Sequence, residues 1–170
     1  MDLVDDIEHG AVFIYPTDTI YGLGCDATNS ESVALIKRIK YRDKDKPISI
    51  IAPSVEWIKK HCFVDNEILE KYLPGPYTLI LKKKDPNFLN DISSNDSLGI
   101  RIPDCEFTEL VEKAGVPFIT TSVNFEGEPY AIKISDISSG IIDAVDIVLG
   151  VGKLDGRPST LVVDGKEIAR

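Results

Sequence analysis

Short apolar runs alternate with segments of helical periodicity along this chain of 170 residues. The apolar runs are rich in β-branched and aromatic residues and end at proline, glycine or polar residues, which predicts buried strands. We expect these strands at residues 11–15, 48–52, 77–82, 98–103, 117–124, 143–150 and 159–165. Apolar residues spaced three and four apart predict helices within 28–40, 54–60, 66–73 and 107–115.

The helix within 28–40 has the clearest predicted start. Its first residues match a capping box, in which Thr28 is the N-cap and Glu31 is the third helical residue. Because strands alternate with helices in part of the chain and with loops elsewhere, we expect an α/β or mixed α+β domain. Such a domain contains parallel and antiparallel strand pairs. No repeat or linker interrupts the pattern, so residues 1–170 are expected to form a single domain.

Charge is unevenly distributed along the chain. The formal net charge is −9, yet the segment 37–46 gathers six cationic residues. They are Lys37, Arg38, Lys40, Arg42, Lys44 and Lys46. The acidic total disfavours a nucleic acid duplex as a tightly held ligand, whereas a local cationic pocket for a small anion stays open.

The rarer residue types exclude several classes of site. Cys25, Cys62 and Cys105 are dispersed, which indicates reduced thiols rather than a disulfide framework. The two histidines lie in unrelated contexts and argue against a His-based zinc site and a Ser-His-Asp triad. No apolar run approaches the roughly 18 residues of a membrane span. The acidic N-terminus lacks the features of a signal peptide, so a cytoplasmic location is expected.

Two glycine-containing segments resemble nucleotide-binding loops but lack required residues. Gly152-Lys153 is followed by Leu154 instead of Ser or Thr, and the earlier glycine of a phosphate loop is missing. The segment 22–24 lacks the third glycine of a dinucleotide fingerprint. Neither segment therefore predicts a nucleotide site.

Four polar clusters beside predicted strands are more informative. They are Thr17, Asp18, Thr19 and Tyr21; Lys40, Arg42 and Lys46; Thr121, Ser122 and Asn124; and Ser159 with Thr160. Hydroxyl, amide and cationic groups bind phosphate and carboxylate oxygens. No nucleophile–base pair accompanies them, so chemistry that depends on positioning and charge stabilisation fits best, as in transfer at phosphorus.

Six segments together carry a resemblance to a known family. They read YPTDTIYGLGCDA, KYRDKDKPISI, LPGPYTLIL, GIRIP, TTSVNFEGEP and RPSTLVVD. They follow the family's order and cover nearly the whole chain. On these segments the chain resembles the YrdC-like proteins, the TsaC class of threonylcarbamoyl-AMP synthases. The resemblance implies an open, twisted, mixed sheet with flanking helices around a concave, cationic cavity.

The resemblance also implies an activity. L-threonine, bicarbonate and ATP would give threonylcarbamoyl-AMP and pyrophosphate, and a downstream threonylcarbamoyl transferase complex would use the product to modify tRNA. The threonine amine and bicarbonate would form an N-carboxy intermediate whose carboxylate attacks the α-phosphorus of ATP. Mg²⁺ is expected to arrive with ATP, held by phosphates and water rather than by a protein metal site.

Family motifs assign residues to these substrates. Lys40 and Arg42 match the family's catalytic, phosphate-binding pair. The residues expected to contact ATP are Lys40, Arg42, Lys46, Ser97, Ser122, Asn124 and Arg170. The residues expected to contact threonine are Thr19, Arg101, Thr120 and Ser159. The remaining cations of the segment, Lys37, Arg38 and Lys44, are expected to face solvent.

The chain departs from the family pattern at two internal positions. Asp43 stands where proline is usual, and Val123 stands where alanine is usual. The last residue, Arg170, aligns loosely with a late ATP-binding arginine. The extra C-terminal domain of longer family members is expected to be absent.

Two alternatives stay open at this point. One is an RNA-binding module for double-stranded RNA or tRNA without catalysis of its own, although the charge of −9 weighs against tight binding. The other is a different carbamoyl-adenylate enzyme, like the YrdC-type domain of hydrogenase maturation proteins. Such a domain would need companion domains that this short chain is expected to lack.

Overall fold

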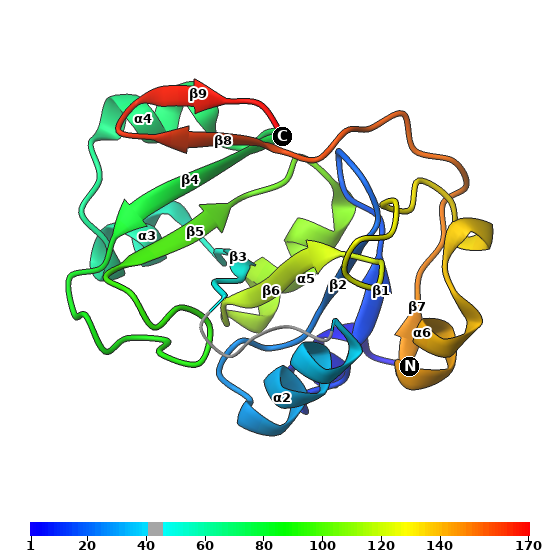
Figure 1. Ribbon diagram of the computed structural model, residues 1–170. Helices are drawn as coiled ribbons and strands as arrows, with labels where there is room; N and C mark the ends of the chain where they lie inside the picture. Colours follow the sequence, from blue (N-terminus) through cyan, green and yellow to red (C-terminus); the bar gives the residue numbers. More distant parts are fainter. Residues whose placement is uncertain (41–45) are drawn as a thin grey trace.

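A computed structural model describes residues 1–40 and 46–170, and its strands form one nine-stranded sheet within these ranges (Figure 1). The strands are β1 (Phe13–Tyr15), β2 (Gly22–Gly24), β3 (Ser49–Ile51), β4 (Tyr77–Lys82), β5 (Ser97–Arg101), β6 (Phe118–Ser122), β7 (Ile147–Val148), β8 (Thr160–Val163) and β9 (Lys166–Ile168). Their order across the sheet is β7-β1-β2-β6-β3-β5-β4-β8-β9.

Strand pairing in this sheet is mixed. The pairs β3–β5, β4–β8 and β1–β7 are parallel, and the other neighbouring pairs are antiparallel. This confirms the predicted α/β class with both kinds of pairing. That the protein comprises this one domain stays a prediction.

Six α-helices and one short 3₁₀ helix accompany the sheet in the described part of the chain. They are α1 (Leu3–Glu8), α2 (Ser30–Ile39), α3 (Val55–His61), α4 (Asn66–Tyr72), α5 (Glu106–Ala114), η1 (Ile134–Asp136) and α6 (Ser139–Ala144). In the view of Figure 1, α3 and α5 lie behind the sheet. None of the helices in the described ranges has the length and apolar character needed to cross a bilayer.

The helices bury apolar side chains against both faces of the sheet. Phe107 of α5 stacks on Tyr15 of β1 with ring centroids 4.1 Å apart, and it meets Phe118 of β6 edge-on. Ile58 of α3 and Leu69 of α4 belong to a second cluster that includes strand residues of β4 and β5. Phe118 lies on the same face of β6 as Thr120 and Ser122, because side chains two apart point to the same side, so α5 covers only part of that face.

The predicted capping box of α2 is wrong by one residue. Asn29 is the N-cap, and its side-chain oxygen accepts a hydrogen bond from the Ser32 amide at 3.1 Å. Thr28 instead donates its hydroxyl to the Asp26 carboxylate at 2.7 Å. Because the Thr28 hydroxyl bonds the Asp26 carboxylate, Thr28 does not cap the helix.

Strand prediction failed most clearly at residues 143–150. The helix α6 extends to Ala144, and only Ile147–Val148 pair with β1. The Asp146 carboxylate accepts a hydrogen bond from the Val12 amide at 2.8 Å, so a side chain takes the place of a longer backbone ladder. The strands β2 and β9 were not predicted, because one consists of Gly-Leu-Gly and the other is exposed.

Candidate active site

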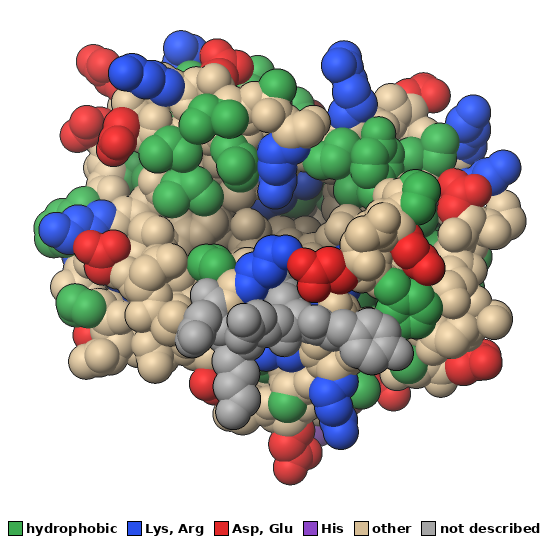
Figure 2. Space-filling model, viewed as in Figure 1, with side chains coloured by type: hydrophobic (Ala, Val, Ile, Leu, Met, Phe, Trp, Pro, Cys, Tyr) green, Lys and Arg blue, Asp and Glu red, His purple; other side chains and the backbone are tan. Residues whose placement is uncertain are grey.

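A cavity of about 530 Å³ opens on the face of the central strands that carries Arg101, Thr120 and Ser122. Ser97, Gly99 and Arg101 of β5 line it, as do Thr120 and Ser122 of β6. Side chains alternate between the two faces of a strand, so residues two apart face the same side. Figure 2 shows a hollow on this face of the molecule, with Lys or Arg side chains on its rims.

Arg101 is held at one end of the cavity by groups from the loop after β1. It is only 4% exposed, and it donates hydrogen bonds to the Thr19 hydroxyl at 3.1 Å and to the Gly75 carbonyl at 3.2 Å. It also forms an ion pair with Asp18, whose other oxygen accepts a hydrogen bond from the Asp104 amide. The Arg101 Nε is buried and finds no acceptor among the described residues. A buried donor of this kind is costly unless a ligand satisfies it.

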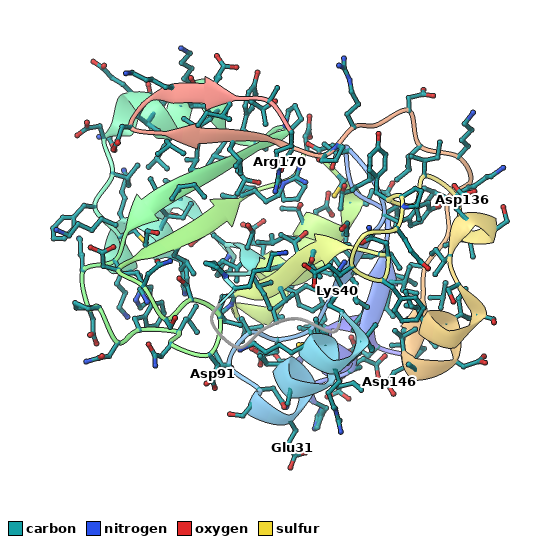
Figure 3. All side chains as sticks on the ribbon, in the orientation of Figure 1. Glu31, Lys40, Asp91, Asp136, Asp146 and Arg170 are labelled. Carbon is teal, nitrogen blue, oxygen red and sulfur yellow. The ribbon has the colours of Figure 1, made fainter. Side chains whose placement is uncertain are left out.

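A second guanidinium lies nearby. Arg170 donates to the Ser159 carbonyl at 2.9 Å and to the Ser159 hydroxyl at 2.6 Å, and that hydroxyl lies 2.6 Å from the Thr78 hydroxyl. Burial lowers the pKa of Arg170, and the positive charge of Arg101 lowers it further. Figure 3 labels Arg170 at the upper side of the open face, near the end of β9. Two guanidiniums with hydroxyls between them form a local site for an anion.

Lys40 lies at the opposite side, at the C-terminal end of α2 (Figure 3). It is 4% exposed, and its ammonium donates to the backbone carbonyls of Ser122 and Asn124, each at 2.8 Å. It also donates to the Asn124 side-chain oxygen at 2.6 Å. Lys40 therefore supports the Ser122–Asn124 turn from behind, and it does not contribute to the cavity lining.

The other predicted cations take different positions. Lys46 pairs with Glu126 at 2.6 Å, with both side chains about half exposed, and it does not line the cavity either. Arg42 and Lys44 lie outside the described residues. Arg38 is exposed as predicted, whereas Lys37 is half-buried. The phosphate-binding roles of Lys40, Arg42 and Lys46 stay predictions.

Eight of the predicted contact residues do line the cavity. They are Thr19, Ser97, Arg101, Thr120, Ser122, Asn124, Ser159 and Arg170. They come from sequence positions up to 151 apart, and the strand order places them around one space. Their individual substrate contacts stay predictions.

Several lining residues had no predicted role. The Thr78 hydroxyl forms a hydrogen bond with the Ser159 hydroxyl. The PGPYT motif, which contains Thr78, could have identified it. Gly99 is less visible in sequence: a Cβ there would lie 2.6 Å from the Ser49 hydroxyl, so glycine keeps the strand close to its neighbour. Tyr130 lines the cavity while 39% exposed, and nothing in its local sequence singles it out.

No cluster of His, Cys, Asp or Glu in the described ranges could hold a metal ion. Glu128 is the one acidic residue among the described residues that line the cavity. That Mg²⁺ arrives with ATP stays a prediction.

Comparison with known proteins adds a family and a fold. The profile of the Sua5_yciO_yrdC family, described as "Telomere recombination", matches residues 5–170. A protein of Methanocaldococcus jannaschii is 37% identical over 164 residues, which make up 94% of this chain and 77% of that protein. The threonylcarbamoyl-AMP synthase of Mus musculus is 33% identical over 137 residues, 78% of this chain but only 49% of that protein.

A solved structure agrees with the observed topology. The P. abyssi Sua5 structure complexed with L-threonine superimposes with a TM-score of 0.80 and 24% sequence identity. The match covers 96% of this chain and 50% of that chain. At this identity the likeness concerns the fold.

Proposed function

Because the chain belongs to the Sua5–YciO–YrdC family, we propose that it is an L-threonylcarbamoyl-AMP synthase. The observation that carries the proposal is the anion site built by Arg101 and Arg170, with Thr19 and Ser159 beside them. These residues lie in the PTDT, GIRIP and RPST segments and at the last position of the chain. The chain spans about half the length of the mouse relative, so the full activity is proposed from the part that is shared.

In this proposal Arg101 binds the carboxylate of L-threonine. Its buried Nε has no acceptor in the described ranges, and a carboxylate would satisfy it with a charge-assisted hydrogen bond. Asp18 holds one terminal nitrogen, which fixes the orientation of the guanidinium. The hydroxyls of Thr19, Thr120 and Ser159 are then available to the rest of the amino acid.

The proposed ATP site occupies the side of the cavity formed by Ser97, Ser122 and Asn124. Mg²⁺ enters with ATP, coordinated by phosphates and water. Lys46, which precedes the lining residue Pro47, is proposed to exchange Glu126 for a phosphate, and Arg42 is proposed to join it. Lys40 would act mainly by holding the Ser122–Asn124 turn.

The reaction proceeds in two balanced steps. The threonine nitrogen attacks the carbon of bicarbonate, water leaves, and an N-carboxy group forms. A carboxylate oxygen of that group then attacks the α-phosphorus of ATP, and pyrophosphate leaves with its electron pair. Cationic and hydroxyl groups around the phosphates offset the negative charge that develops during this transfer.

Pyrophosphate release tests the proposal. Purified protein with Mg-ATP, bicarbonate and each of several amino acids should release pyrophosphate in a threonine-dependent manner. Release that does not depend on any amino acid would instead favour a carbamoyl-adenylate enzyme of the hydrogenase-maturation kind. Absence of release with every amino acid would overturn the synthase proposal.

The remaining functional expectations depend on this activity. Transfer of the product to tRNA by a downstream transferase complex, and with it a cytoplasmic location, stay predictions. The RNA-binding alternative is not favoured, because curated relatives of this family carry the synthase name.

A further inference from the structure

Lys83 is a buried cation outside the cavity that the proposed reaction does not use. It is 1% exposed, and its ammonium donates to the Phe88 carbonyl at 3.0 Å and to the Ser93 carbonyl at 2.9 Å. Within the described ranges it forms no ion pair with a carboxylate. Burial lowers its pKa, as expected for an ammonium removed from water.

The loop between β4 and β5 is folded around this ammonium. The Lys83 amide donates to the Asp96 carbonyl at 2.8 Å, which closes the base of the loop. The side chain then bonds two carbonyls inside the loop, from Phe88 and Ser93. In Figure 3, Asp91 marks the far part of this loop. Without the ammonium, both carbonyls would lose their donor, and the loop would lose its internal anchor.

The same loop contacts the cavity wall at two places. The Ser93 hydroxyl donates to the Ser97 carbonyl at 2.7 Å, and the Asn95 side-chain oxygen accepts from the amide and hydroxyl of Ser97, each at 2.9 Å. The Ile92 carbonyl accepts from the Ile48 amide at 3.0 Å. Both Ser97 and Ile48 line the cavity, on the side proposed for ATP.

From this chain of contacts we propose that Lys83 is a positioning residue for nucleotide binding. It holds the loop 84–96 so that Ser97 and Ile48 keep the geometry of the ATP side of the cavity. Arg101 and Ser159, on the threonine side, have no hydrogen bond to this loop among their described contacts. The proposal deepens the synthase proposal and rests on it for the identity of the nucleotide.

Substitution of Lys83 by methionine tests the proposal, because methionine keeps most of the length and removes the charge. We expect the affinity for Mg-ATP, measured by titration calorimetry, to fall about tenfold or more. The KM for ATP should rise in parallel, while the KM for threonine changes by less than about twofold. The matched control is Lys84→Met, since Lys84 is exposed and its ammonium contacts the Lys59 carbonyl and the Phe63 ring, neither of which belongs to the loop 84–96. This control should behave as wild type.

A second variant covers the case in which Lys83→Met does not fold. Ser93→Ala keeps the carbonyl that Lys83 bonds but removes the hydroxyl that reaches Ser97. It should weaken ATP binding in the same direction. Rescue by Lys83→Arg, which restores a cation, would separate positioning from simple loss of stability.

Specific outcomes would overturn the proposal. Wild-type ATP affinity in folded Lys83→Met, or in Ser93→Ala if the first variant is unfolded, would do so. An equal loss of ATP and threonine affinity would indicate a general structural role instead. Because ATP affinity is measured directly, failure of the synthase reaction in the wild-type protein would be recognised separately.

Discussion

Lys40 shows how a single buried ammonium can support a binding turn. Its three N–H groups are matched by three oxygen atoms of Ser122 and Asn124 within 2.8 Å. Asn124 in turn donates its amide to the Glu128 carbonyl at 2.6 Å, which extends the support into the next loop. The position of two cavity residues therefore depends on a residue outside the cavity lining.

Replacing Lys40 by methionine should damage stability and activity together. The carbonyls of Ser122 and Asn124 would lose a buried donor, so we expect unfolding free energy to fall by about 1–3 kcal/mol. The rate of threonine-dependent pyrophosphate release should fall by at least about tenfold. Denaturant unfolding and the pyrophosphate assay measure the two effects.

The control for this variant is Arg38→Met, which removes an exposed cation from the same helix. It should leave both quantities close to wild type. An unchanged unfolding midpoint in Lys40→Met would contradict the supporting role described above.

Motif residues were predictable, but the residues that support them were not. Thr19, Arg101, Ser122 and Ser159 lie in short segments that match motifs of the family, so the resemblance could identify them as candidates before their place around the cavity was known. The bonds of Lys40 join residues 82 and 84 positions apart, and only the sheet brings them together. Asp18 was recognised as part of a polar cluster, but its pairing with Arg101 across 83 positions was not.

At the scale of elements, the segment after β7 is held by hydrogen bonds to the Tyr21 hydroxyl. The Tyr21 hydroxyl donates to the Gly152 carbonyl at 2.7 Å and accepts from the Val151 amide at 3.0 Å. Further along, Gly156 approaches Thr19 so closely that a Cβ would lie 1.4 Å from its carbonyl oxygen. The segment 151–158 is thus held against the threonine side of the site.

Substitution of Tyr21 by phenylalanine should loosen this segment. Both hydrogen bonds of the hydroxyl are lost, which should destabilise the protein by about 1 kcal/mol and raise the KM for threonine several-fold. The KM for ATP should change less, because Gly156 of this segment lies against Thr19, on the threonine side of the cavity. Steady-state kinetics with each substrate varied in turn measures this difference.

Tyr77→Phe is the matched control, since Tyr77 of β4 has no hydroxyl hydrogen bond among its described contacts. It should retain wild-type constants for both substrates. Equal kinetic constants for Tyr21→Phe and the control would contradict the role of the Tyr21 hydroxyl in holding the segment 151–158.

Helices and strands were predicted correctly where one of their faces is buried. The strand over 77–82 and the helix within 107–115, which ends at the left-handed Gly115, were found because one face of each is apolar and buried. Exposed or very short elements such as β2 and β9 carry no such pattern, since pairing within the sheet and not their own composition stabilises them.

At the scale of the molecule, the mixed sheet brings residues that are far apart in the sequence to one site. The sheet and its connecting segments bring Thr19, Arg101, Ser159 and Arg170 from distant parts of the chain around one cavity. The buried guanidinium of Arg101 and the more exposed one of Arg170 create a local anion site in a chain whose formal net charge is −9. The acidic exterior and the cationic site are therefore compatible, because short-range contacts in a partly buried cavity outweigh a screened surface field.

Identification of the reaction product is the most direct test of the central claim. The protein is incubated with L-threonine, Mg-ATP and isotopically labelled bicarbonate, and the mixture is analysed by mass spectrometry. The account predicts threonylcarbamoyl-AMP carrying the label in its carbamoyl carbon, formed in equal amount with pyrophosphate. Folded protein that binds ATP and threonine but yields no labelled threonylcarbamoyl-AMP would contradict it.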